Sequence, residues 1–110
     1  MVRNGLQQPY YNLDEVRRLA NERKVRFLPR DDGKSDPANL GIDEDDAIDI
    51  IAGLSITEFD ITIDGDDRHP PADVYKTRRK LPEHNIPIII YIKLAIRGNG
   101  QLLLIISFHK

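Results

Sequence analysis

Three polar side chains interrupt the otherwise apolar C-terminal segment of this 110-residue chain: Tyr91, Lys93 and His109. A histidine with an ordinary pKa of about 6.5 can act as an acid or as a base near neutral pH. A lysine adds a fixed positive charge, and a tyrosine adds a hydroxyl group that can orient a proton. Together they indicate acid–base chemistry beside a cation. The alternative is three ordinary residues of a half-exposed sheet, with the histidine at a strand end.

Two apolar strands near the C-terminus have to position these side chains, and they cover residues 86–97 and 102–109. Successive side chains alternate between the two faces of a strand. Tyr91 and Lys93 therefore share one face of the first strand. Ser107 and His109 share one face of the second, so the turn between the strands decides whether the two pairs meet.

The glycines of this turn allow two registers for the hairpin. A three-residue loop at 98–100, with Gly100 left-handed in a bulge, pairs Tyr91 with Ser107 and brings all four polar residues to one face. A two-residue turn of Asn99 and Gly100 would set Tyr91 beside an apolar side chain and disperse them. We favour the longer loop, because the shorter one leaves Ile and Phe side chains on the open face.

The composition is typical of one soluble globular domain. Hydrophobic residues make up 40% of the chain and charged residues 31%, and a chain of this length supports a single core. With no cysteine, disulfides are excluded, and a zinc site would need histidines and carboxylates alone. Because phosphate-loop, zinc and nucleophile-elbow motifs are absent from the sequence, we expect neither a metal nor a cofactor. We also expect no membrane span and a cytoplasmic location.

Charge is unevenly distributed along the chain, although the net charge is only −2. Residues 31–67 carry thirteen acidic side chains and one basic one, whereas both flanking thirds are basic. A basic surface built from the two ends would suit a polyanion; the alternative is an acidic layer that is merely solvated. The candidate phosphate contacts are Arg68, His69, Lys76, Arg78, Arg79 and Lys80. Each is also compatible with a solvated loop or charge run.

Local patterns predict the remaining elements. Leu13 begins an amphipathic helix capped by Asn12, and Asp43 caps a second helix. Further strands are expected at 24–28, 59–63 and 73–77, with polar loops at 31–40 and 64–71. Residues 1–12 are predicted to be a flexible lead-in and residues 13–110 a single domain. The order of elements predicts an α+β fold, an antiparallel sheet with two main helices on one face.

Five segments, taken in order, carry a family resemblance: LDEVRRLANERKVRF at 13–27, LGIDEDDAIDIIAGLSITEF at 40–59, DVYK at 73–76, IYIKLAI at 90–96 and LLIISFH at 103–109. Their order and spacing resemble the MqsR family of bacterial toxins. The resemblance implies a RelE-like fold and the toxin of a type II toxin–antitoxin system. It implies a metal-independent mRNA interferase, an endoribonuclease that arrests growth by cutting transcripts, typically at GCU-type sites. It also implies an antitoxin of the MqsA type, which holds structural zinc and binds operator DNA.

The resemblance also assigns site residues. Tyr91 matches the tyrosine of the family, and His109 stands where a lysine commonly follows the Ser-Phe pair. The expected lysine is replaced by Ile-Thr-Ile at 61–63, and the glutamine expected before the DVY motif is Ala72. We therefore predict His109, Tyr91 and Lys93 as catalytic residues, and the six candidate phosphate contacts as RNA-binding residues. The alternatives are a toxin-fold module that binds an antitoxin or RNA without cleavage, and a small structural domain without nucleic-acid contact.

Overall fold

The computed structural model describes residues 8–110, in which two α-helices and five strands form an α+β fold. The helices are α1 (Leu13–Asn21) and α2 (Glu44–Ala52), with short 3-10 helices η1 (Pro37–Leu40) and η2 (Ile56–Glu58). The strands are β1 (Val25–Phe27), β2 (Phe59–Ile63), β3 (Ala72–Arg79), β4 (Ile88–Arg97) and β5 (Leu102–His109). The predicted fold class is confirmed. Part of the predicted lead-in, residues 1–7, lies outside the described residues.

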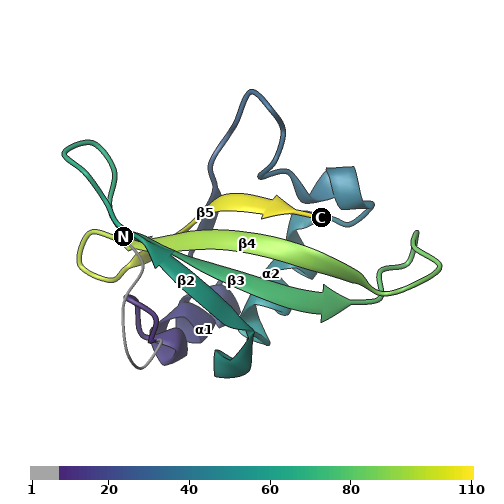
Figure 1. The fold of residues 1–110 in the computed structure, drawn as a ribbon, viewed down its shortest axis with the longest axis horizontal. Coiled ribbons are helices and arrows are strands. Elements are labelled where there is room, and N and C mark those ends of the chain that lie inside the picture. Colours follow the sequence, from purple (N-terminus) through teal and green to yellow (C-terminus); the bar gives the residue numbers. More distant parts are fainter. Residues whose placement is uncertain (1–7) are drawn as a thin grey trace.

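The strands form one sheet in the order β1-β5-β4-β3-β2. Strands β2 to β5 are joined antiparallel, as predicted. β1 pairs parallel with β5, so the sheet is mixed instead of entirely antiparallel. Both α-helices lie behind this sheet in Figure 1. Their buried side chains pack with those of β3, β4 and β5 in one core. In the part of the chain that the structure describes, no α-helix covers the opposite face, which we call the open face.

Both helices begin where the sequence predicts. The Asn12 side chain accepts hydrogen bonds from the backbone N–H groups of Asp14 and Glu15, and the Asp43 carboxylate accepts one from that of Asp46. The acidic first turn of α2 lies at the positive end of its helix dipole. The apolar stripes of the two helices are thereby aimed at the same face of the sheet.

The turn between β4 and β5 differs from the prediction. Residues 98–101 form a four-residue loop, so Arg97 pairs with Leu102 instead of with Gln101. The predicted three-residue loop is therefore wrong. Both Gly98 and Gly100 have a left-handed backbone, with φ of 66° and 76°. The turn built on these two glycines also includes Gln101.

A β-bulge in β5 nevertheless brings the polar residues together. The register of the β4–β5 pair shifts by one residue at Ile106. Without this shift, alternation from the buried Ile105 would turn Ser107 toward the core and Phe108 outward. With it, Phe108 is buried in the core at 1% exposure, and Ser107 and His109 turn to the open face. They share that face with the polar residues of β4, as predicted, but Tyr91 pairs with His109 instead of with Ser107.

Asp73, at the start of β3, ties the segment before α1 to the sheet. Its fully buried carboxylate accepts hydrogen bonds from the backbone N–H groups of Tyr10 and Tyr11, at 2.9 and 2.8 Å, and from the Thr62 hydroxyl at 2.6 Å. The Tyr11 hydroxyl also donates to the carbonyl oxygen of Pro71 at 2.7 Å. The described residues just before α1 are therefore anchored to the start of β3 and to the residue that precedes it.

Tyr75 carries a buried hydroxyl group that has no hydrogen-bond partner among the described residues. An unpaired buried polar group costs about 1–3 kcal/mol. We therefore expect Tyr75→Phe to raise the free energy of unfolding by about 1 kcal/mol in chemical denaturation at neutral pH. A variant that is clearly less stable than the parent would contradict this expectation.

The same phenol makes stability depend on alkaline pH. Burial raises its pKa above the ordinary value, and the nearby Asp73 charge adds to the effect. The unfolded phenol ionises near pH 10 while the folded one does not, so stability that is present below pH ~10 is lost as the pH rises further. Denaturation curves at pH 9 and 11 should show a larger loss for the parent than for Tyr75→Phe. Equal losses would contradict the role of Tyr75.

Candidate active site on the open face of the sheet

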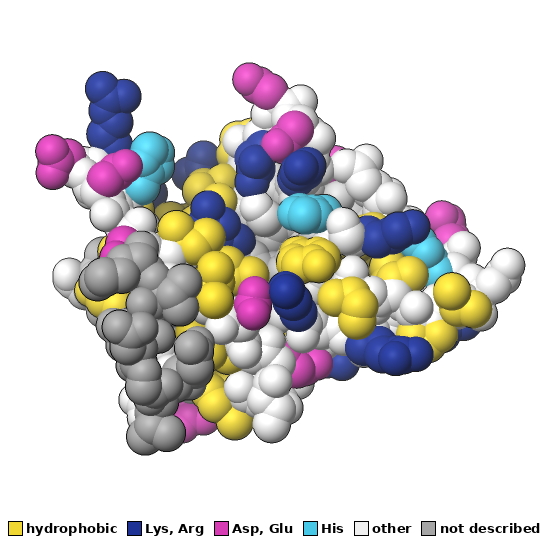
Figure 2. All heavy atoms as spheres, viewed as in Figure 1, with side chains coloured by type: hydrophobic (Ala, Val, Ile, Leu, Met, Phe, Trp, Pro, Cys, Tyr) yellow, Lys and Arg dark blue, Asp and Glu magenta, His cyan; other side chains and the backbone are white. Residues whose placement is uncertain are grey.

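The site is built on a row of three side chains that crosses the open face. Strand register places Lys76 of β3 opposite Tyr91 of β4, and Tyr91 opposite His109 of β5. The Lys76 Nζ atom lies 5.2 Å from the centroid of the Tyr91 ring. The rings of Tyr91 and His109 stack at 5.7 Å, with 19° between their planes. Figure 2 looks onto this face, where basic, histidine and hydrophobic side chains lie together. A cation, a phenol and an imidazole can thus meet one ligand.

Lys76 is held by contacts on two sides. Its ammonium group lies over the Tyr91 ring in a cation–π geometry, and it lies 3.4 Å from Oδ2 of Asp60. Asp60 occupies an irregular position in β2, where the register with β3 shifts. Tyr91 is 38% exposed, so the row can be reached from solvent. The arrangement places a held positive charge beside an accessible hydroxyl group, which suits an anionic ligand.

His109 ends β5 with one ring nitrogen engaged. Its Nδ1 atom lies 3.0 Å from the backbone carbonyl oxygen of Lys110. Because a carbonyl oxygen can only accept a hydrogen bond, Nδ1 carries a proton in this arrangement, and the neutral form of the ring has its lone pair on Nε2. An imidazole in this tautomer can take a proton from a hydroxyl group of a substrate.

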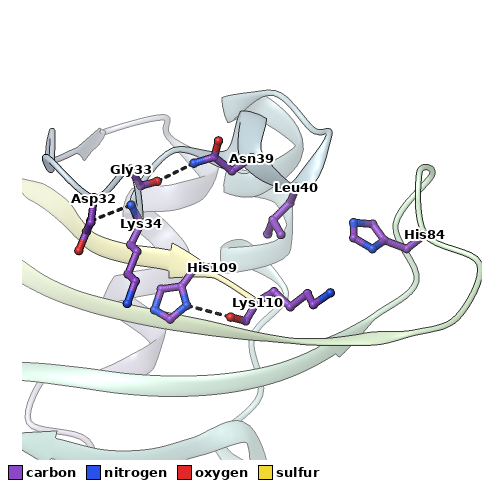
Figure 3. Close-up of a pocket in the computed structure, with 8 residues that line it drawn as sticks. All are labelled: Asp32, Gly33, Lys34, Asn39, Leu40, His84, His109 and Lys110. Carbon is purple, nitrogen blue, oxygen red and sulfur yellow. Dashed lines mark hydrogen bonds between the residues drawn. The ribbon is translucent and has the colours of Figure 1, made fainter.

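His109 also lines a cavity of about 340 Å³ at the end of β5 (Figure 3). Lys34, His84 and Lys110 line the same cavity. In Figure 3 the Lys34 side chain extends beside the His109 ring, whereas His84 stands apart on the loop between β3 and β4. Sequence reasoning missed Lys34 and His84, because each is an isolated polar residue in a loop and belongs to no motif.

A second polar row lies next to the first. Lys93 pairs with Ser107, whose hydroxyl accepts a hydrogen bond from Arg30 Nη1 at 2.6 Å. Arg30 Nη2 also lies 2.8 Å from Oδ2 of Asp32. The backbone N–H of Lys34 and then the Arg30 guanidinium lower the pKa of Asp32, so this carboxylate is ionised at neutral pH. Sequence reasoning missed Arg30, since it reaches β5 from a loop 77 residues earlier in the chain.

The sheet divides the basic run that the sequence presents as one patch. β3 extends to Arg79, beyond the predicted end of this strand, so successive side chains alternate between its faces. Lys76 and Arg78 lie on the open face. Arg79 turns to the helix side, where its Nη1 atom lies 3.6 Å from Oε2 of Glu58. Lys80 follows the strand and donates a hydrogen bond to the next carbonyl group at 3.2 Å. Lys76 and Arg78 are therefore the two members of the run that share the face of the row.

Arg68 and His69 lie on the projecting loop between β2 and β3. Asp66 Oδ1 accepts hydrogen bonds from both of their backbone N–H groups at 2.8 Å and lies 3.2 Å from His69 Nδ1. These hydrogen bonds lower the pKa of Asp66, and the bond from the Arg68 backbone has the largest effect. His69 lines a second cavity together with Lys93, instead of joining the row that contains Tyr91.

The positions where the resemblance places a lysine and a glutamine hold neither residue in this protein. Residues 61–63 lie in β2, at the edge of the sheet, and pair with the first residues of β3. Ala72, in place of the glutamine, is buried and lines the same cavity as Lys93. The reactive groups of the open face therefore come from later positions, in β3, β4 and β5.

Neither a metal site nor a membrane-spanning helix is found in the part of the chain that the structure describes. Across residues 8–110, His, Asp and Glu side chains form no group of three or more that could hold a metal ion. The α-helices in this range contain nine residues each. No helix among these residues is long and apolar enough to cross a membrane.

Comparison with protein families gives a match over nearly the whole chain. The family model described as "Motility quorum-sensing regulator, toxin of MqsA" matches residues 8–110. Comparison with curated proteins gives no match. The matched range contains every residue of the two polar rows and of both cavities.

Proposed function

The chain belongs to the MqsR family of toxins, and from this we propose that it is the endoribonuclease of a type II toxin–antitoxin system, which cleaves mRNA without a metal ion and arrests growth. The observation that carries the proposal is the row of Lys76, Tyr91 and His109 on the open face. Metal-free RNA cleavage needs a proton acceptor, a proton donor and fixed positive charge around one phosphate. The row supplies one group of each kind.

Cleavage in this proposal uses the 2′-hydroxyl group of the RNA itself. His109 Nε2 takes the proton of that hydroxyl, the 2′ oxygen bonds to phosphorus, and the bond from phosphorus to the 5′ oxygen breaks. The Tyr91 hydroxyl gives its proton to the departing 5′ oxygen. The products are a 2′,3′-cyclic phosphate and a free 5′-hydroxyl end, and proton exchange with water restores both side chains.

Positive charge on the open face stabilises the phosphate during this step. Lys76 beside Tyr91 and Lys93 in the neighbouring row face the negative charge that develops on the phosphoryl oxygens. Arg78 extends the positive charge along β3, and Arg30 lies on the other side, against β5. These cations suit an RNA backbone that crosses the sheet from β3 to β5. Arg68, Arg79 and Lys80 are proposed as more distant backbone contacts.

A second candidate function is a toxin-fold module that binds RNA or an antitoxin without cleaving RNA. The observation in its favour is that neither the 61–63 segment nor Ala72 supplies the lysine and the glutamine that family resemblance leads us to expect. Loss of two polar groups would weaken catalysis more than binding, because binding draws on charges spread over the whole face.

The partner class follows from the family, whose description names the toxin of MqsA. We propose that an antitoxin of this type, containing zinc and binding DNA, is encoded for this toxin, and that the toxin acts on mRNA in the cytoplasm. Coexpression of such an antitoxin should neutralise the chain. The antitoxin would then restore growth without changing the amount of toxin present.

Induction of the intact chain in a bacterial host tests the proposal directly. We expect growth to stop within one or two generations, and sequencing of transcript 5′ ends to show new ends, with free 5′-hydroxyl groups, at a short preferred sequence. Tyr91→Phe is the matched variant, because it keeps the ring over which Lys76 lies and removes the hydroxyl. Unchanged growth with abundant, folded protein would contradict the proposed endoribonuclease activity and favour a module that binds without cleavage.

A further inference from the structure

A second cavity, also of about 340 Å³, opens on the same face of the sheet beside the two polar rows. It lies beneath the projecting loop at 64–71, and Leu28 closes it from the other side. Figure 2 shows hydrophobic side chains gathered in the hollow between the two loops that project from this face. Its volume falls in the range of about 300–1,000 Å³ that is typical of small-molecule sites.

The walls of this cavity are apolar and its rim is charged. The walls are formed by Leu28, Ile63, Pro70, Ala72, Leu104 and Ile106. The charged and polar side chains are those of Lys93, Asp64, Asp66 and His69. Two backbone N–H groups hold the Asp66 carboxylate in place as a hydrogen-bond acceptor, while the Lys93 ammonium is a donor. A flat, apolar ligand with donors and acceptors along one edge would satisfy both groups.

Lys93 connects this cavity with the row of Lys76, Tyr91 and His109. This residue follows Tyr91 by two positions on the same face of β4, a separation of about 7 Å along the strand. A nucleotide whose phosphate lies at Tyr91 can therefore direct its base toward Lys93. RNA-binding sites commonly hold unstacked bases between apolar and aromatic side chains and bind their polar edges by hydrogen bonds.

We propose that this cavity binds one RNA base next to the scissile phosphate, with the base against the apolar walls and its polar edge toward Asp66 and Lys93. The inference rests on the proposed function for the identity of its ligand. It explains an apolar hollow beside a charged row, and it assigns Asp66, His69 and Lys93 to the selection of the cleavage sequence.

Binding of small ligands to the intact chain tests the inference without any cleavage. Nucleoside 5′-monophosphates should shift the methyl NMR signals of Leu104 and Ile106 in a saturable way. Ribose 5-phosphate has the same sugar and phosphate but no base, and it should leave these signals in place. Equal shifts with ribose 5-phosphate, or no shift with any nucleotide, would overturn the inference.

A cavity-filling variant gives the second measurement. Ile106→Trp should weaken nucleotide binding about five- to 150-fold, the range expected for loss of one base contact. The matched control is Ile56→Trp, because Ile56 is 54% exposed in η2 and lines neither cavity. Equal binding by both folded variants would contradict the inference.

The two proposals fail in different ways. If the chain binds nucleotides in a base-dependent way but leaves RNA intact, the proposed function is wrong and the proposed base site stands. If the chain cleaves RNA and its Ile106→Trp variant cuts at the same positions with the same preference, the proposed function stands and the proposed base site is wrong.

Discussion

Replacement of His109 by alanine is expected to lower the rate of RNA cleavage about 10²- to 10⁴-fold, the contribution typical of a positioned general base. The imidazole stacks on Tyr91, and its neutral form has the lone pair on Nε2 because Nδ1 donates to the Lys110 carbonyl oxygen. The measurement is the initial rate of cleavage of a short RNA at neutral pH. His109 is partly exposed at the end of β5, so the variant should remain folded.

His109→Lys separates the role of the proton acceptor from that of charge. A lysine with an ordinary pKa of about 10.4 is almost fully protonated at pH 7, so it retains positive charge but cannot accept a proton. We expect slow cleavage at pH 7 and a rate that rises as the pH approaches 10. A rate for either variant equal to that of the parent at pH 7 would show that His109 is not the base.

Replacement of Asp73 by asparagine is expected to lower the free energy of unfolding by about 2–4 kcal/mol, since hydrogen bonds to charged groups contribute more than neutral ones. Asp73 is fully buried and accepts hydrogen bonds from Tyr10, Tyr11 and Thr62. An asparagine side chain keeps one acceptor oxygen and turns an NH₂ group toward the remaining donors. The loss should be visible as a lower midpoint in urea denaturation with an unchanged slope.

Asp67→Asn is the matched control for this measurement. This variant makes the same aspartate-to-asparagine change at an exposed position in the loop at 64–71. Surface substitutions of this kind usually change stability by no more than about 0.5 kcal/mol. Equal midpoints for Asp73→Asn and Asp67→Asn would show that the buried carboxylate does not anchor the segment before α1.

Local chemistry was sufficient to predict most of the elements. The caps at Asn12 and Asp43 and the bounds of β2 agree with the structure. These features depend on hydrogen bonds and side-chain periodicity within a few residues of the chain, and such interactions are encoded where they occur. The α+β class follows from their order.

Register could not be predicted in the same way. The turn at 98–101 and the bulge at Ile106 set it jointly, and the bulge forms where Phe108 can then pack in the core against the helices. The packing of a core depends on all the elements that border it, so the turn pattern and the burial of the two strands alone favoured the wrong loop. The predicted cluster of Tyr91 with His109 still formed, because the bulge offsets the longer loop.

The sequence thus establishes which reactive side chains are available and which short segments carry them. Tertiary structure alone brings Lys76 over Tyr91, adds Arg30 and Lys34 beside β5, and turns Arg79 away from the face of the row. The physical reason is that these contacts join distant parts of the chain, and their geometry depends on strand register and core packing, which no local pattern specifies.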